Sequence, residues 1–102
     1  MVPPELRLKI RSRLEAAFGP RLKGVVLYGS EARGDAGPES DIDLLVLVEG
    51  ERWQDLGDAT HALYPLVLES GRLIEAHPVE LKTYEAGEFA LYRNAKQEGV
   101  FL

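Results

Sequence analysis

The chain contains no cysteine, which excludes disulfide bonds, zinc sites built from thiolates and a cysteine nucleophile. Basic residues are also scarce, because 12 Lys and Arg stand against 17 Asp and Glu. The resulting net charge of −5 argues against nonspecific capture of a nucleic-acid backbone. No apolar leader opens the chain, and no apolar run approaches the roughly 20 residues needed to span a bilayer. These absences predict a cytoplasmic protein that binds neither membranes nor nucleic acid directly.

What the chain does contain suits one globular domain, residues 1–102, in which hydrophobic residues make up 45% of the total. The first apolar pattern is a four-residue repeat, Leu6, Ile10, Leu14 and Phe18, which predicts a helix between Pro3-Pro4 and Gly19-Pro20. Nearly continuous apolar runs predict two buried strands, Gly24–Tyr28 and Ile42–Val48. The Gly-, Pro- and acid-rich residues 29–40 predict a loop between these strands.

The second half of the chain predicts one more strand between two helices. Trp53, Leu56, Thr60, Leu63 and Val67 form a helical stripe that places Trp53 and Leu56 in the core, and Pro65 should kink or end this helix early. A strand over Leu73–Leu81 follows, with Pro78 favouring an edge or a bulge. A last helix should begin near Thr83 or Glu85 and run through Gln97. The predicted fold class is α+β, a small mixed sheet with helices packed on it.

Two acids stand at the start of the second predicted strand, where Asp41 and Asp43 flank Ile42. Alternate residues of a strand share a face, so their carboxylates should project together, about 6.6 Å apart along the chain. Ile42 should point into the core and prevent a register slip, which would bury both acids. Paired carboxylates of this kind are typical ligands of Mg²⁺, and a divalent ion would also remove their mutual repulsion.

A glycine and a serine, Gly29-Ser30, stand where the first predicted strand ends. Glycine permits a sharp turn and the close approach of a ligand, while the Ser30 hydroxyl and the following amides could hold phosphate oxygens. Arg33 lies within reach either of those phosphates or of Glu31 or Asp35. A phosphate cradle facing a metal-binding acid pair is the equipment for displacement at a nucleotide phosphorus.

The stretch GSEARGDAGPESDIDL resembles the signature of nucleotidyltransferases of the DNA polymerase β superfamily, and it is most similar to the minimal nucleotidyltransferases of bacteria and archaea. The ending AKQEGVFL is also similar to the Glu-Gly-Val ending of that group. The resemblance implies transfer of a nucleoside monophosphate, with ATP as substrate and one or two Mg²⁺ ions. It implies that Gly29, Ser30 and Ser40 bind the nucleotide, that Arg33 supports the loop or the phosphates, and that the metal ligands are Asp41 and Asp43.

The resemblance also raises the question of a third carboxylate on a later strand. Glu75 is the first candidate for this catalytic residue and Glu80 the second. If neither serves, Asp43 or a metal-bound hydroxide would deprotonate the acceptor. His61 and His77 have no second His or Cys at ligand spacing, which predicts structural or surface roles.

The acceptor is implied only by analogy. The family suggests a tyrosine of a small helical partner of the HEPN type in a toxin-antitoxin pair, with Val100, Phe101 and Leu102 either at that interface or buried in this chain. One alternative is a small hydroxyl compound resembling an aminoglycoside, whose pocket a homodimer could complete. The other is a module that binds nucleotide or partner without catalysis.

Overall fold

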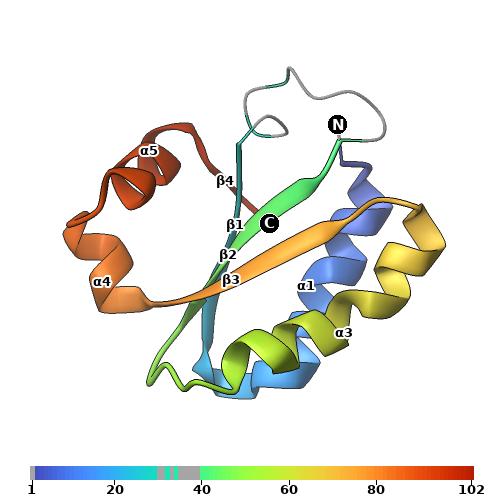
Figure 1. The fold of residues 1–102 in the computed structure, drawn as a ribbon, viewed down its shortest axis with the longest axis horizontal. Helices are drawn as coiled ribbons and strands as arrows, with labels where there is room; N and C mark the ends of the chain where they lie inside the picture. Colours follow the sequence, from blue (N-terminus) through green and yellow to red (C-terminus); the bar gives the residue numbers. More distant parts are fainter. Residues whose placement is uncertain (1, 30–31, 33, 35–39) are drawn as a thin grey trace.

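A computed structural model describes residues 2–29, 32, 34 and 40–102 of the chain. Within this part, helices flank a single sheet (Figure 1). The elements are α1 (Pro4–Phe18), the 3₁₀ turn η1 (Gly19–Arg21), β1 (Leu22–Tyr28), β2 (Ile42–Val48), α3 (Asp55–Ser70), β3 (Ile74–Glu80), α4 (Leu81–Ala86), α5 (Ala90–Glu98) and β4 (Val100–Phe101).

The four strands form one mixed sheet in the order β3-β2-β1-β4. β1 runs antiparallel to both of its neighbours, β2 and β4, whereas β2 and β3 run parallel. The predicted fold class, α+β with a small mixed sheet, is therefore confirmed. β3 lies at an edge of the sheet, as the proline at position 78 indicated.

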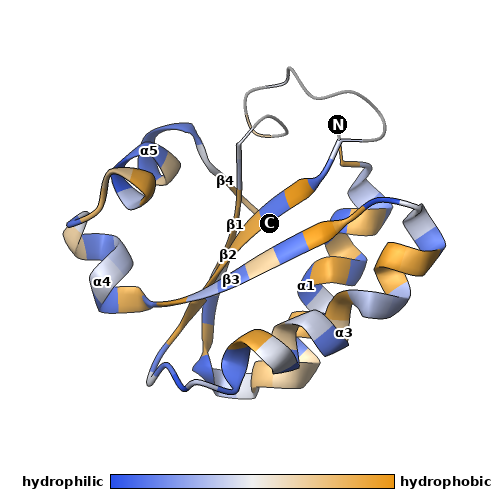
Figure 2. Cartoon of the chain, in the orientation of Figure 1, coloured by the Kyte–Doolittle hydropathy of each residue, from blue (hydrophilic) through white to orange (hydrophobic). Residues whose placement is uncertain are grey.

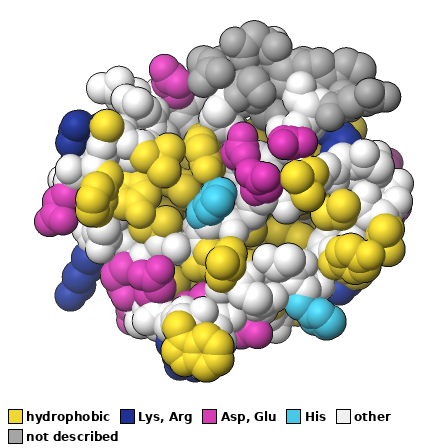
Figure 3. Space-filling view, in the orientation of Figure 1, with side chains coloured by type: hydrophobic (Ala, Val, Ile, Leu, Met, Phe, Trp, Pro, Cys, Tyr) yellow, Lys and Arg dark blue, Asp and Glu magenta, His cyan; other side chains and the backbone are white. Residues whose placement is uncertain are grey.

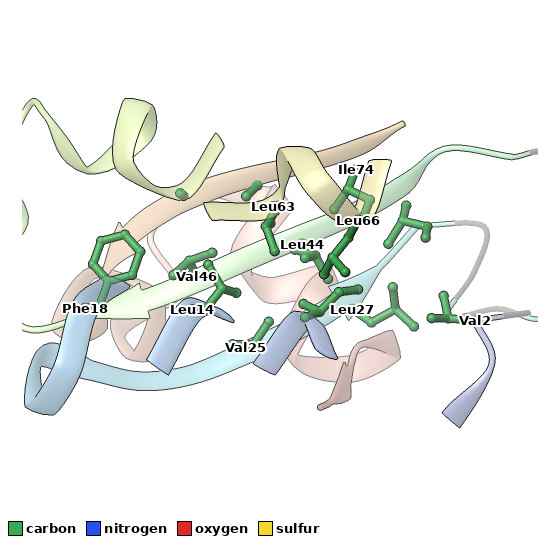
Figure 4. Packing of buried hydrophobic residues seen from close by; sticks show 14 of the residues in the cluster. Val2, Leu14, Phe18, Val25, Leu27, Leu44, Val46, Leu63, Leu66 and Ile74 are labelled. Carbon is green, nitrogen blue, oxygen red and sulfur yellow. The ribbon is translucent and has the colours of Figure 1, made fainter. Parts of the chain in front are cut away.

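One face of the sheet is covered by α1 and α3, which pack their apolar sides on the strands to form the larger core (Figures 1, 2 and 4). The opposite face carries a smaller cluster under α4 and α5. Because both faces are covered along most of β2, six of its seven residues are buried. The smaller cluster consists of Val26, Leu45, Leu47, Val79, Tyr84 and Ala95.

The predicted stripe of α3 is correct at Leu63, which is buried, and at Val67, which packs against the larger core, but it is wrong at its beginning. Trp53 is 91% exposed and Leu56 55% exposed, so neither belongs to the core. The helix begins only at Asp55, and its buried side is formed by Asp55, Ala59, Ala62, Leu63 and Leu66. Small and large apolar residues together therefore form the buried side of the helix, while Trp53 and Leu56 lie outside the core.

Pro65 does not end α3, which continues to Ser70 and stops at Gly71 in the left-handed conformation. Pro65 is exposed, so the carbonyl that loses its helical donor can be hydrated. No helix of the described part of the chain has the length and apolarity that crossing a membrane requires.

The last predicted helix is two helices, α4 and α5, separated at Gly87, whose φ is 64°. After α5 the chain turns back to the sheet and pairs β4 with β1. Gly99 makes this return possible, since a Cβ there would overlap the Ala95 carbonyl oxygen and lie 2.5 Å from a methyl carbon of Val26. The tail is neither fully buried nor fully free: Phe101 is 63% exposed, while Leu102 packs against the larger core.

Candidate active site

Three strand ends meet where the candidate site lies: the end of β1 and the starts of β2 and β3. In the sheet register Asp43 of β2 stands between Tyr28 of β1 and Glu75 of β3. All three belong to the face that α4 and α5 cover only in part, so the sheet carries apolar residues under the helices and polar residues beyond them. On this face, acidic side chains adjoin a band of apolar ones (Figure 3).

The structure brings Gly29 directly against Asp43. Gly29 ends β1 with a φ of 76°, and a Cβ built on it would lie 3.0 Å from Oδ2 of Asp43. A side chain at this position would therefore meet both backbone strain and the carboxylate. The absence of a side chain leaves the backbone of the bend open beside the carboxylate.

Asp41 precedes β2 and is exposed, whereas Ile42 is fully buried in the larger core. The Ile42 amide also donates to the Leu73 carbonyl oxygen at 2.8 Å, which fixes the backbone between the two acids. Asp41 lies near enough for its charge to raise the pKa of Asp43. Ile42 points into the larger core, as predicted, and Asp43 faces the opposite side of the sheet.

The electrostatics of the site are unfavourable for a negative charge on Asp43. Partial burial raises the pKa of its carboxyl group, and the neighbouring Glu75 raises it further through its charge and a side-chain hydrogen bond. Asp41 acts in the same direction, and only His77 opposes them. Three acids thus share one small region without a compensating Lys or Arg among the described groups that shift Asp43.

A nucleotidyltransferase-domain family model matches residues 7–102, nearly the whole chain. The chain belongs to the nucleotidyltransferase family. A "putative protein adenylyltransferase" of Methanocaldococcus jannaschii is 31% identical over 88 residues, which cover 84% of this chain and 83% of that protein.

Two crystal structures share the fold. One, of a toxin-antitoxin with AMP-PNP, superposes with a TM-score of 0.68 at 20% identity, covering 93% of this chain and 70% of the other. The second, a "putative nucleotidyltransferase" from Sulfolobus solfataricus, gives a TM-score of 0.56 at 20% identity, covering 95% and 78% of the two chains. The resemblance read from the GSEARGDAGPESDIDL stretch is therefore confirmed at the level of family and fold.

The two candidates for a third carboxylate in this nucleotidyltransferase lie at opposite ends of β3. Glu75 pairs with Asp43, but Glu80 pairs with Val48 at the far end of the parallel ladder. The Glu80 carboxylate accepts hydrogen bonds from the backbone amides of Gly50 and Glu51, both at about 3 Å, and these hydrogen bonds stabilise the turn after β2. The structure therefore removes Glu80 from the candidate site, since five residues of strand span about 16 Å.

Two of the predicted nucleotide-binding residues, Ser30 and Arg33, lie outside the described residues. Ser40 is described, and its carbonyl oxygen accepts a hydrogen bond from Nε of Arg72 at 3.0 Å. Arg72, between α3 and β3, is only 7% exposed. This buried guanidinium ties the segment that leads into Asp41 to the start of β3, and nothing in the local sequence pattern distinguished it from a surface arginine.

Sequence reasoning also missed the aromatic edge of the site. His77 follows Glu75 on the same face of β3, and its ring lies 6.5 Å from that of Tyr28. Burial and the charges of Asp43 and Glu75 raise the pKa of the Tyr28 hydroxyl. The alternation Glu75–His77 on one predicted strand was the available signal for His77. His61 is exposed on α3, consistent with its predicted surface role.

Proposed function

We propose that this nucleotidyltransferase transfers AMP from ATP to a tyrosine hydroxyl of a small helical partner protein of the HEPN type. The assembly of Asp41, Asp43 and Glu75 beside the Gly29 bend is the observation that carries the proposal. The name of the Methanocaldococcus relative supports a protein acceptor and an adenylyl group. The toxin-antitoxin crystal structure with AMP-PNP supports a partner protein and an adenine nucleotide.

The acid pair fits Mg²⁺. Both ligands would be carboxylate oxygens. The pKa of Asp43 is raised by burial first and then by the charges of Glu75 and Asp41, and a divalent cation would neutralise that charge. Among the described residues no three His, Cys, Asp or Glu side chains are grouped as a metal cage. Mg²⁺ usually takes only one or two carboxylates and completes its shell with water and phosphate oxygens, so Asp41 and Asp43 suffice. When bound, the ion or ions would withdraw charge from the phosphates.

The chain's own residues would bind and orient the triphosphate. The amides that follow Gly29 in the sequence, with Ser30 and Ser40, would donate to phosphate oxygens, and Arg33 would support the loop or the phosphates. In the transfer step the acceptor oxygen forms a bond to the α-phosphorus while the bond from that phosphorus to the bridging oxygen breaks, and pyrophosphate leaves in line. Glu75 would take the hydroxyl proton, since its carboxylate is exposed at the rim beside Asp43.

Labelled ATP and Mg²⁺ test the proposal directly. The protein is incubated with and without a helical protein encoded next to it, and tyrosine labelling is read by mass spectrometry. We expect label on the partner's tyrosine, and its loss in Asp41→Asn and Asp43→Asn. Asp58→Asn is the matched control, because Asp58 is exposed on α3 outside the site.

Tight association without any label would instead favour a partner-binding module. Label appearing only on added hydroxyl compounds, such as aminoglycosides, would move the acceptor from protein to small molecule. Label that persists in both Asn variants would overturn the assignment of the acid pair.

A further inference from the structure

A second hollow adjoins the acid site at the Gly29 bend. It lies between the end of β1 and the helix α5 and has a volume of about 250 Å³. Gly29 lines this cavity, and a Cβ at Gly29 would lie 3.0 Å from Oδ2 of Asp43. A molecule reaching past Gly29 would therefore touch both regions. The cavity is lined by Tyr28, Gly29, Leu91, Asn94, Ala95 and Glu98.

The helix side of the cavity is a single stripe of α5. Residues 91, 94, 95 and 98 follow the spacing of three and four that places side chains on one helical face. Ala95 is only 3% exposed and packs in the same cluster as Val26, so its small side chain sets the distance between helix and strand. The amide of Gly99 donates to the Ala95 carbonyl at 2.7 Å, which fixes the end of the helix. The cavity is consequently preformed.

The chemistry of the lining selects an uncharged occupant. None of the described residues that line it is Lys or Arg, and Glu98 adds a negative charge. A phosphate would therefore find no cationic side chain among the described lining residues and belongs beside the metal-binding acids. Leu91, Ala95 and the ring of Tyr28 offer apolar contact, and the Asn94 amide offers one donor and one acceptor group. The volume lies just below the range of small-molecule pockets, roughly 300–1,000 Å³, which suits a heterocyclic base with part of its ribose.

We propose that this cavity holds the nucleoside of the transferred nucleotide and that Asn94 selects adenine, an inference that rests on the proposed function. An Asn amide can donate to N7 and accept from the N6 amino group of adenine at the same time. Guanine presents two acceptors, N7 and O6, on the same edge, so the amide oxygen of Asn94 would face O6 without a proton between them. The cavity thus favours ATP over GTP.

The kinetic test compares Asn94→Leu with the wild type. Leucine keeps the size of the side chain and removes both hydrogen-bonding groups. We expect KM for ATP to rise about tenfold and the preference for ATP over GTP to fall by a similar factor, as expected for one bidentate base contact. The kcat should stay within about twofold, because the acids are untouched. Gln97→Leu is the matched control, since Gln97 is exposed on α5 and does not line the cavity.

An activity-independent test uses adenosine, which has no phosphate, without any metal. Adenosine titrated into ¹⁵N-labelled protein should shift the side-chain amide signal of Asn94, identified by its absence in Asn94→Leu, and the backbone amides of Gly29 and Ala95. Guanosine should shift them much less. Adenosine shifts elsewhere or none at all, or an unchanged nucleotide preference in Asn94→Leu, would overturn the proposal. If the protein transfers nothing at all, the proposed function fails while the adenosine titration still decides the cavity.

Discussion

Acidic residues lie at both ends of the parallel strands β2 and β3, but the groups that surround them shift their pKa values in opposite directions. At the far end Asp55 is 1% exposed and accepts hydrogen bonds from the two terminal nitrogens of Arg21, Nη2 at 2.7 Å and Nη1 at 3.1 Å, and from the Arg52 amide. At the same end, Glu80 accepts hydrogen bonds from two backbone amides. Arg21 lowers the pKa of Asp55, and the Glu51 amide, with further backbone donors, lowers that of Glu80.

At the near end, burial and two neighbouring acids raise the pKa of Asp43. The two ends thus differ in whether their acids have hydrogen-bond donors as partners. Acids that face donors stabilise the fold, whereas acids that face one another lower stability unless a cation joins them. A domain tolerates the second arrangement at a site whose ligand supplies the missing positive charge.

The largest difference between the two ends is expected when each glutamate of β3 is replaced by glutamine. Glu75→Gln should lower the initial rate of adenylyl transfer about 100-fold, because a positioned general base contributes at least that factor. Glu80→Gln should leave the rate within about twofold and lower Tm, since the amides of Gly50 and Glu51 both lose an anionic acceptor. A full rate in Glu75→Gln would remove Glu75 from the proposed mechanism.

Removing Asp55 tests the partnered end. Asp55→Ala should lower the free energy of unfolding by about 2–3 kcal/mol, because a buried charged acceptor and its bonds to Arg21 and Arg52 disappear together. Urea denaturation measures the change. Glu49→Ala is the control: it removes an exposed pair with Lys23 at 3.7 Å, and exposed pairs contribute little. An equal loss of unfolding free energy in Asp55→Ala and Glu49→Ala would contradict a larger stabilising role for Asp55.

The two ends should also differ in their response to acid. Asp55 and Glu80 have pKa values below the ordinary 3.8 and 4.5, so their stabilisation is complete above those values and is lost as pH falls through the lower, folded ones. The pKa of Asp43 is raised, so its contribution to stability has the opposite pH dependence: protonation at low pH removes a partly buried charge and its repulsion by Glu75. We expect unfolding free energies from urea titrations to be nearly flat from pH 7 to 5 and to fall below about pH 4. Asp55→Ala should make that fall shallower.

The smallest expected effect concerns the near end alone. In metal-free buffer Asp43→Asn should raise Tm by about 2 °C. The substitution removes a carboxylate charge that burial and the neighbouring Glu75 destabilise, as the raised pKa of Asp43 indicates, and solvent screening keeps the effect small. The same variant is expected to lose transfer, so stability and activity would move in opposite directions. Differential scanning calorimetry with Asp58→Asn as the control measures the shift. A lower Tm would mean that Asp43 stabilises the fold.

The local sequence pattern was sufficient to predict an element where apolar residues recur regularly along it. The four-residue repeat of α1 and the unbroken apolar run of β2 predicted both elements closely, and the alternation around Ile42 predicted that Asp41 and Asp43 share a side. The pattern failed at the beginning of α3, because a stripe of large apolar residues looks like a core face whether or not a neighbour covers it. It also failed for the last helix, where Gly87 divides α4 from α5.

The choice between Glu75 and Glu80 lay beyond the sequence for a different reason. Both are acids of one strand, and only the register of β3 beside β2 places Glu75 at Asp43 and Glu80 at Val48. The buried contact of Arg72 with Ser40 and the cavity under α5 likewise depend on segments far apart in the chain.

The sequence by itself determined the family, the α+β architecture with a mixed sheet, and the spacing that places a glycine bend and two aspartates at the facing ends of neighbouring strands. Tertiary structure decided which further groups join them, because strand register and helix docking bring together residues whose separation along the chain carries no information about distance. It also decided which acids receive donors and which face one another, and that distribution of partners separates the supporting end of the sheet from the end where we place the chemistry.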